Sequence, residues 1–198
     1  VTNCAVLSRK YVIPERKRMK LFLPVIVGTT RPNRQSIHVA KFIHSVMEQT
    51  EGVTTQLVDP EDFSLPGDGN GPENKDPKYT AITEKADGFL IVVPEYNHSF
   101  PGSLKRLLDS ELKNYNHKAV AFAGVSAGPW GGVRAIESLV NAVREMGLIA
   151  TAVDVQFPSV HKLFDEDGKM TEDKYQERVQ RTITELAWMS QALKQARG

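Results

Sequence analysis

The chain of 198 residues has little cysteine, with Cys4 as its single thiol. One cysteine cannot form an internal disulfide or a cysteine-ligated metal cluster, so a disulfide scaffold and a zinc site of the cysteine type are excluded. Low cysteine content is typical of a chain from a reducing compartment. We therefore expect a cytoplasmic protein.

An excess of charge of one sign is also absent, because 25 Lys and Arg residues oppose 24 Asp and Glu residues, for a net charge of +1. A nearly neutral chain has no general attraction to nucleic acid or to an anionic membrane, and we expect neither as a partner. No apolar run approaches the length that spans a bilayer. The histidines show no metal-ligand spacing, so we predict no metal site: His38, His44, His98, His117 and His161.

The length fits one ordinary domain, which we place at residues 21–198. Residues 1–20 carry six Lys and Arg residues without an apolar core or a clear period. They lack the apolar region of a secretory signal peptide. We interpret them as a flexible extension, with an organelle-targeting segment as the alternative.

Apolar runs alternate with helical patterns along the rest of the chain. A run such as Gly88–Val93 is apolar at every position, which is typical of a strand buried on both faces of a parallel sheet. Alternating strands and helices imply right-handed βαβ units and an α/β three-layer sandwich with helices on both faces. Five strands suggest the order 2-1-3-4-5. They are 21–27 (with regular pairing mainly from Val25, after Pro24), 54–59, 88–93, 118–125 and 148–155.

A helix is predicted after each strand, and between strands two and three a long loop precedes the helix. Residues 60–78 are rich in Pro, Gly, Asp and Asn, which predicts a long loop, either a lid or a mobile segment. Ser99 is a possible cap for the helix that follows strand three. The expected helices follow Ser36, cover 79–86, 102–112 and 133–143, and run from about 171 to 195.

Three polar loops follow strands one, three and four, at 28–36, 94–99 and 124–132. In the 2-1-3-4-5 order these strands are neighbours, so the loops converge on one crevice at the carboxyl edge of the sheet, where open α/β sheets bind ligands. Asp59, Asp87 and Asp109 do not cluster as a phospho-acceptor pocket would, so a response regulator of similar fold is not expected.

The first loop has the groups that a phosphate monoester requires. Hydroxyls at Thr29 and Ser36, guanidiniums at Arg31 and Arg34, and the amides of a helix N-terminus lie within eight residues. The loop is neither a Walker loop nor a GxGxxG dinucleotide loop. The alternative is a polar turn without a ligand.

Several motifs resemble one family. Residues 94–109 follow the pattern PEYN…S.PG.LK…D, residues 126–139 follow S.G..GG…A…L, and the first loop is similar to G-S-x-R…S with Thr29 in place of serine. These patterns resemble the flavodoxin-like NAD(P)H-dependent FMN reductases, which include quinone, chromate and azo-dye reductases. The resemblance covers about residues 21–155 and implies a flavodoxin-like fold.

The resemblance also implies an FMN site. The phosphate would contact the first loop, although the spacing leaves open which residue after Arg31 contacts it most directly. The second loop would line the flavin ring mainly through its main chain, and the third would lie on the pyrimidine side. The implied cofactor-binding residues are Thr29, Arg31, Arg34, Gln35, Ser36, Pro94, Glu95, Tyr96, Asn97, Ser126 and Gly128.

An enzyme of this family takes hydride from NADPH or NADH onto FMN and reduces a small-molecule acceptor, such as a quinone, an azo compound, a metal oxyanion or free flavin. We expect no side-chain acid or base and a homodimer or homotetramer, in which Trp130 covers a substrate or packs at an interface. Among the histidines, His98 alone merits a test. The alternatives are a flavodoxin-type electron carrier, which the near-neutral charge argues against, and a flavin-binding redox sensor.

Overall fold

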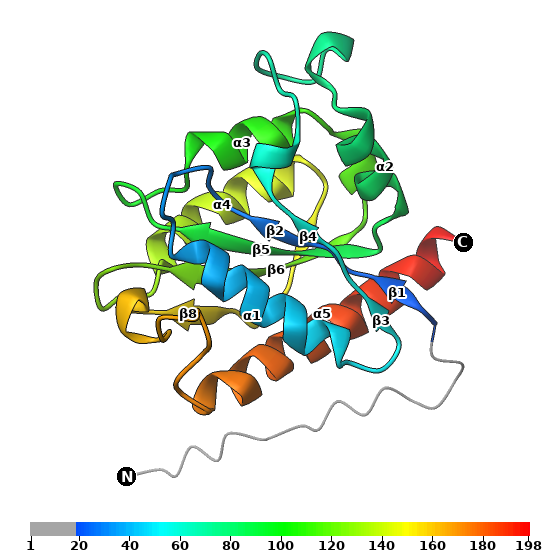
Figure 1. Ribbon diagram of the computed structural model, residues 1–198. Helices are drawn as coiled ribbons and strands as arrows, with labels where there is room; N and C mark the ends of the chain where they lie inside the picture. Colours follow the sequence, from blue (N-terminus) through cyan, green and yellow to red (C-terminus); the bar gives the residue numbers. More distant parts are fainter. Residues whose placement is uncertain (1–18) are drawn as a thin grey trace, which may run out of the picture.

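The computed structural model describes residues 19–198, in which strands and helices alternate (Figure 1). The strands are β1 (Leu21–Phe22), β2 (Val25–Val27), β3 (Val53–Thr54), β4 (Leu57–Val58), β5 (Gly88–Pro94), β6 (Ala119–Val125), β7 (Ile149–Ala150) and β8 (Val155–Phe157). The helices are α1 (Ser36–Glu48), α2 (Pro77–Lys85), α3 (Gly102–Asp109), α4 (Val133–Glu145) and α5 (Lys174–Arg197). The expected extension, residues 1–20, lies outside the described residues except for its last two.

The main sheet has the strand order β4-β2-β5-β6-β7, with β8 paired to the carboxyl half of β6. Every pair is parallel. β1 and β3 form a separate parallel pair. The first, second and fifth predicted strands each appear as two short ones: β1 with β2, β3 with β4, and β7 with β8, where β3 begins one residue before the predicted strand and β8 continues to Phe157, beyond the predicted end at 155. Counted in this way, the order is the predicted 2-1-3-4-5.

The first strand is interrupted at Pro24, which has no N–H to give to a ladder. Pairing resumes immediately, because the N–H of Val25 bonds to the carbonyl of Gln56 at 2.9 Å. Leu23, before the break, bonds to the carbonyl of Thr54 at 2.9 Å. The interruption therefore leaves the register between the two strands intact and leaves β2 in the middle of the sheet.

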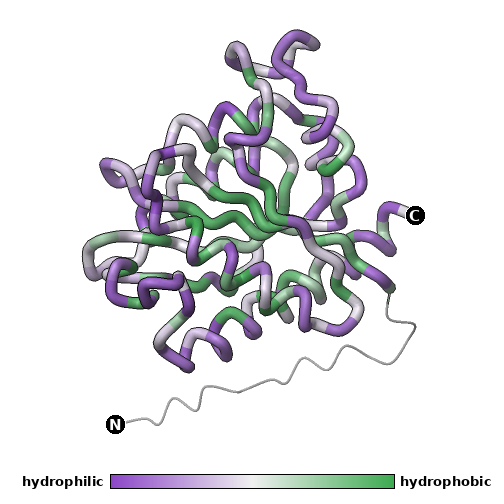
Figure 2. The backbone as a smooth tube through the Cα atoms, in the orientation of Figure 1, coloured by the Kyte–Doolittle hydropathy of each residue, from purple (hydrophilic) through white to green (hydrophobic). Residues whose placement is uncertain are grey.

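β5 and β6 form the centre of the molecule. All seven residues of each strand are buried, and they pair in register from Gly88 with Ala119 to Pro94 with Val125. Helices α1 and α5 cover one face, and α2, α3 and α4 cover the other (Figure 1). Hydrophobic residues gather in the central strands, and hydrophilic ones on the outer turns (Figure 2). A rigid centre of this kind fixes the ends from which the polar loops leave.

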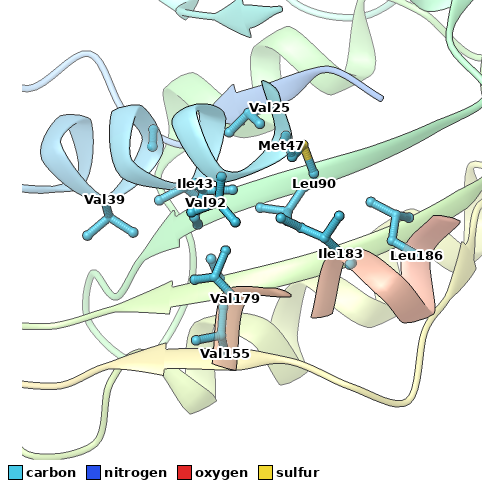
Figure 3. Close-up of a cluster of buried hydrophobic side chains, with 14 of the residues drawn as sticks. Val25, Val39, Ile43, Met47, Leu90, Val92, Val155, Val179, Ile183 and Leu186 are labelled. Carbon is cyan, nitrogen blue, oxygen red and sulfur yellow. The ribbon is translucent and has the colours of Figure 1, made fainter. Parts of the chain in front are cut away.

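The residues of α1 and α5 that repeat at helical spacing are buried against the sheet, as the sequence predicted. Val39, Ile43 and Met47 of α1 face the strands. Val179 and Ile183 of α5 lie in the same cluster of buried side chains (Figure 3). None of the helices in residues 19–198 combines the length and the apolar composition needed to cross a bilayer.

The cap predicted at Ser99 is wrong. α3 begins at Gly102 after Pro101 in the cap position, and no side chain caps it. The Ser99 hydroxyl instead shares a hydrogen bond of 2.8 Å with the hydroxyl of Ser138 in α4. The proline fixes an extended entry to the helix, so the serine two residues earlier cannot reach the first-turn amides.

Asp154, which lies between β7 and β8, has a carboxyl group whose pKa is raised. Burial raises the pKa of Asp154 to about 6, which a backbone hydrogen bond from Phe122 only partly offsets. The folded state therefore binds a proton more tightly than the unfolded chain, so stability falls as the pH rises from about 4 through 6. We expect Asp154→Asn to raise the urea midpoint progressively over this range and by a constant amount above it. A pH-independent difference between the two proteins would contradict this assignment.

Candidate functional site

The loops after β2, β5 and β6 surround one open cavity of about 270 Å³. Nine of the eleven residues singled out from the sequence line it: Thr29, Arg31, Arg34, Gln35, Ser36, Pro94, Glu95, Tyr96 and Ser126. The predicted convergence of the three loops at the carboxyl edge of the sheet is therefore present in the structure. Four further residues complete the lining, namely Asn33, Val125, Ala127 and Val160.

Asn97 and Gly128 are the two predicted residues that do not line this cavity. Asn97 and His98 both have positive φ, 49° and 63°, and the main chains of Tyr96 and Ser99 exchange hydrogen bonds of 2.8 and 2.9 Å. This is a tight turn of type I′, which places its two central residues at an exposed tip. His98 therefore projects with the tip of the loop.

The first loop is tied to the second through hydroxyl groups. The Thr29 hydroxyl accepts from the main-chain N–H of Arg31 at 3.2 Å and shares a hydrogen bond of 3.1 Å with the Tyr96 hydroxyl. Thr29 is buried, whereas Arg31 is exposed. The threonine thus organises the turn, and the arginine presents its charge at the mouth of the cavity.

The start of α1 has the properties of an anion site. Gln35 is in the cap position, but no side chain caps the helix. Ser36, the first residue of α1, is 2% exposed, and its buried hydroxyl oxygen has no hydrogen-bond partner. Because the helix N-terminus carries partial positive charge, the uncapped end and the unpaired hydroxyl together favour an anionic oxygen.

Arg34 adds a permanent charge beside this helix start. Its guanidinium forms ion pairs with Asp59 and with Glu61, the latter at 2.8 Å. Burial lowers the pKa of Arg34, but its hydrogen bonds to Glu61 and Asp59 more than offset this and raise the pKa above its ordinary value. Its Nε atom is buried without a partner.

The second loop was expected to line a flavin ring mainly through its main chain, but two of its main-chain donors are occupied. The main-chain N–H groups of Glu95 and Tyr96 are already bonded, to the carbonyls of Val125 and Ser99. The Glu95 side chain is more available, since Oε1 accepts from Arg134 at 2.9 Å while Oε2 is buried without a partner. A side-chain contact is therefore better supported at Glu95 than a main-chain one.

The third loop is held against the segment after β8. The N–H of Ser126 bonds to the carbonyl of Phe157 at 3.2 Å, and the N–H of Val160 returns to the carbonyl of Ser126 at 3.1 Å. These bonds bring Val160 to the cavity. Nothing in its local sequence marks it, because its position depends on pairing between distant strand ends.

The unpaired donors and acceptors at the cavity suit a phosphorylated planar ligand better than a metal ion. Two buried polar atoms without partners, Ser36 Oγ and Arg34 Nε, lie beside the helix start, and a third, Glu95 Oε2, lies in the loop after β5. Within residues 19–198, no group of three or more His, Cys, Asp or Glu side chains is placed to hold a metal ion. The fold and the cavity together define an open α/β protein with a polar crevice at the carboxyl edge of its sheet, which is where proteins of this class bind their ligands.

Comparison with known proteins assigns the family. The model of the NADPH-dependent FMN reductases matches residues 22–162, which include all three loops. The chain belongs to this family. It is thus a flavoprotein oxidoreductase of flavodoxin-like fold that uses FMN, and the resemblance of its motifs is confirmed.

Individual relatives agree with the family. The chain is 31% identical over 156 residues to the NADPH azoreductase of Bacillus sp., which covers 76% of this chain and 83% of that protein. It is 26% identical over 161 residues to a quinone reductase of Pseudomonas putida, and the match covers 75% of this chain and 83% of that protein. The fold is similar to that of FerB, a flavoenzyme NAD(P)H:(acceptor) oxidoreductase from Paracoccus denitrificans, with a TM-score of 0.69, 21% identity, and coverage of 86% and 98%.

Proposed function

We propose that the cavity binds FMN, with the phosphate at the start of α1 and the ring between the second and third loops. Residues 21–198 then form one FMN-binding domain. The observation that carries this proposal is the pair of buried polar atoms without partners, Ser36 Oγ and Arg34 Nε, beside an uncapped helix start. A phosphate monoester supplies acceptors for both groups.

The residues of the chain bind and orient, and bound FMN supplies the hydride chemistry. Arg31, Arg34 and Ser36 hold the phosphate, and the hydrogen bond between Thr29 and Tyr96 fixes the first loop against the second. Glu95 is held by Arg134, so its second oxygen is fixed for a donor on the ligand. No side chain is assigned as a catalytic acid or base.

For the electron acceptor we propose a small organic molecule, a quinone or an azo compound. The names of the azoreductase and of the quinone reductase support this class. Metal oxyanions and free flavin are the alternative acceptors. We propose NADPH as the electron donor, with NADH as the alternative. We also propose a cytoplasmic location, which agrees with the single cysteine.

We also propose that the enzyme is a homodimer or homotetramer. Trp130 is 61% exposed and Val133 is 36% exposed, and both lie where the third loop enters α4. A second copy would cover this apolar surface beside the cavity. Light scattering of the purified chain measures the mass, and a monomer at all concentrations would refute the assembly.

Anaerobic reduction tests the function directly. The purified protein should show the visible absorbance of bound FMN, which NADPH bleaches and a quinone or azo dye restores. NADH in a parallel experiment gives the donor preference. Bleaching without turnover on any acceptor would instead indicate an electron carrier.

Arg31→Ala should weaken FMN binding about tenfold or more, because a hydrogen bond to a charged group contributes about 1.5 to 3 kcal/mol. Arg31 is exposed at the cavity, so its loss should leave the fold intact. Titration of the flavin-free protein with FMN measures the effect. An unchanged Kd would reject Arg31 as a phosphate ligand.

A further inference from the structure

Every terminal N–H of Arg34 is already used inside the protein. Nη1 donates to Glu61 Oε1 at 2.8 Å and to the carbonyl of Arg31 at 3.5 Å. Nη2 donates to Glu61 Oε2 at 3.1 Å and to Asp59 Oδ2. A guanidinium has five N–H donors, so these four bonds leave Nε–H alone, and Nε is buried without a partner in a residue that lines the cavity.

The two carboxylates are themselves fixed by the chain. Asp59 ends the β4 segment and caps the 3₁₀ turn Pro60–Asp62, where its Oδ1 accepts from the N–H of Glu61 at 3.2 Å. Its other oxygen takes the Arg34 bond. The side chains of Arg34 and Asp59 are only 12% and 16% exposed, and neither acidic residue lines the cavity. The acidic pair therefore holds the guanidinium from outside the cavity.

We propose that Asp59 and Glu61 are positioning residues that fix Arg34 with its Nε–H available to the phosphate, and that they thereby determine selectivity for FMN over riboflavin. This inference rests on the proposed FMN site. The planar guanidinium suits the arrangement, because its two terminal nitrogens bind the carboxylates and leave Nε–H as the one donor without a partner.

The direction of the change in FMN affinity, when the carboxylates are neutralised, distinguishes a positioning role from a purely electrostatic one. Two carboxylates near a phosphate repel it, so their neutralisation by itself would tighten FMN binding or leave it unchanged. Positioning predicts the opposite: without its anchors Arg34 samples other rotamers, and part of the binding free energy is lost in ordering it. Riboflavin has no phosphate, so its affinity should not respond.

The experiment titrates the flavin-free 198-residue chain with FMN and with riboflavin, following the quenching of flavin fluorescence. Asp59→Asn keeps the acceptor oxygen that caps the turn, and Glu61→Gln changes a half-exposed side chain, so at least the second variant should fold as the parent does. The matched control is Asp62→Asn, since Asp62 is exposed, lies in the same turn and is not among the partners of Arg34.

We expect each of Asp59→Asn and Glu61→Gln to weaken FMN binding by roughly tenfold, with riboflavin affinity changed less than about twofold. Asp62→Asn should bind FMN as the parent does or slightly more tightly. Equal or tighter FMN binding by the Glu61→Gln variant, or a parallel loss for riboflavin, would overturn the inference. Failure of the parent chain to bind FMN at all would instead refute the proposed function.

Discussion

Ser36→Asp is expected to lower FMN affinity at least 100-fold. Ser36 is the first residue of α1, is 2% exposed, and lines the same cavity as Arg31 and Arg34. A carboxylate there would lie beside the phosphate, and two unit charges about 4 Å apart repel by about 4 kcal/mol at an effective dielectric constant of about 20. Each 1.4 kcal/mol is about a factor of ten in Kd, so even a partly screened repulsion exceeds two orders of magnitude.

In the flavin-free protein the helix dipole offsets part of the cost of burying this carboxylate in the first turn, and the Tm of the flavin-free variant measures what remains. Ser36→Asn is the matched control, since asparagine has nearly the same shape as aspartate and no charge. We expect Ser36→Asn to lose far less affinity in the same fluorescence titration. A Ser36→Asp variant that bound FMN within threefold of the parent would show that the phosphate lies elsewhere.

Gly28→Ala should destabilise the fold and weaken the site together. A Cβ at Gly28, which directly follows β2, would lie 2.3 Å from the carbonyl oxygen of Val92 and 2.9 Å from Cδ of Pro94. The first contact is with backbone of the central strand, which cannot rotate away. Overpacking of this kind costs about 3 kcal/mol, which corresponds to a fall in Tm of roughly 6 to 12 °C.

Relief of the contact would separate β2 from the end of β5, and so the phosphate loop from the ring loop. We therefore expect a lower FMN affinity as well as a lower Tm. Gly102→Ala is the control, because a Cβ there meets nothing within 4 Å and lies in the first turn of α3. Parent-like Tm and affinity for Gly28→Ala would mean that the packing of the two loops is not as tight as described.

The sequence predicted well those features that depend on local pattern and strand order. The apolar run at 88–93 became the buried β5, the run predicted at 118–125 became the buried β6 from Ala119 onward, and the loops that follow them meet at the cavity. The order of neighbouring parallel strands was enough to bring nine of the eleven residues together. Asn97 does not line the cavity, because consecutive positive φ values turn it out to an exposed tip, which residue type alone does not specify.

The ion-pair partners of Arg34 could not be predicted from the sequence. Asp59 and Glu61 lie 25 and 27 residues further along the chain, and a pairing over such separations depends on where the loop after β4 packs. Glu95 was expected to act through its main chain, but its N–H bonds to Val125, which follows from the pairing of β5 with β6. Both surprises come from hydrogen bonds between segments, and both bear on the chemistry of the site.

A crystal structure of the chain grown with FMN is the most direct measurement of where the cofactor lies. We predict the phosphate within hydrogen-bonding distance of Ser36 Oγ and Arg34 Nε, and the ring between Glu95 and Ser126. Crystals that remain colourless in excess FMN, or density for the flavin away from the three loops, would contradict the assignment of this cavity.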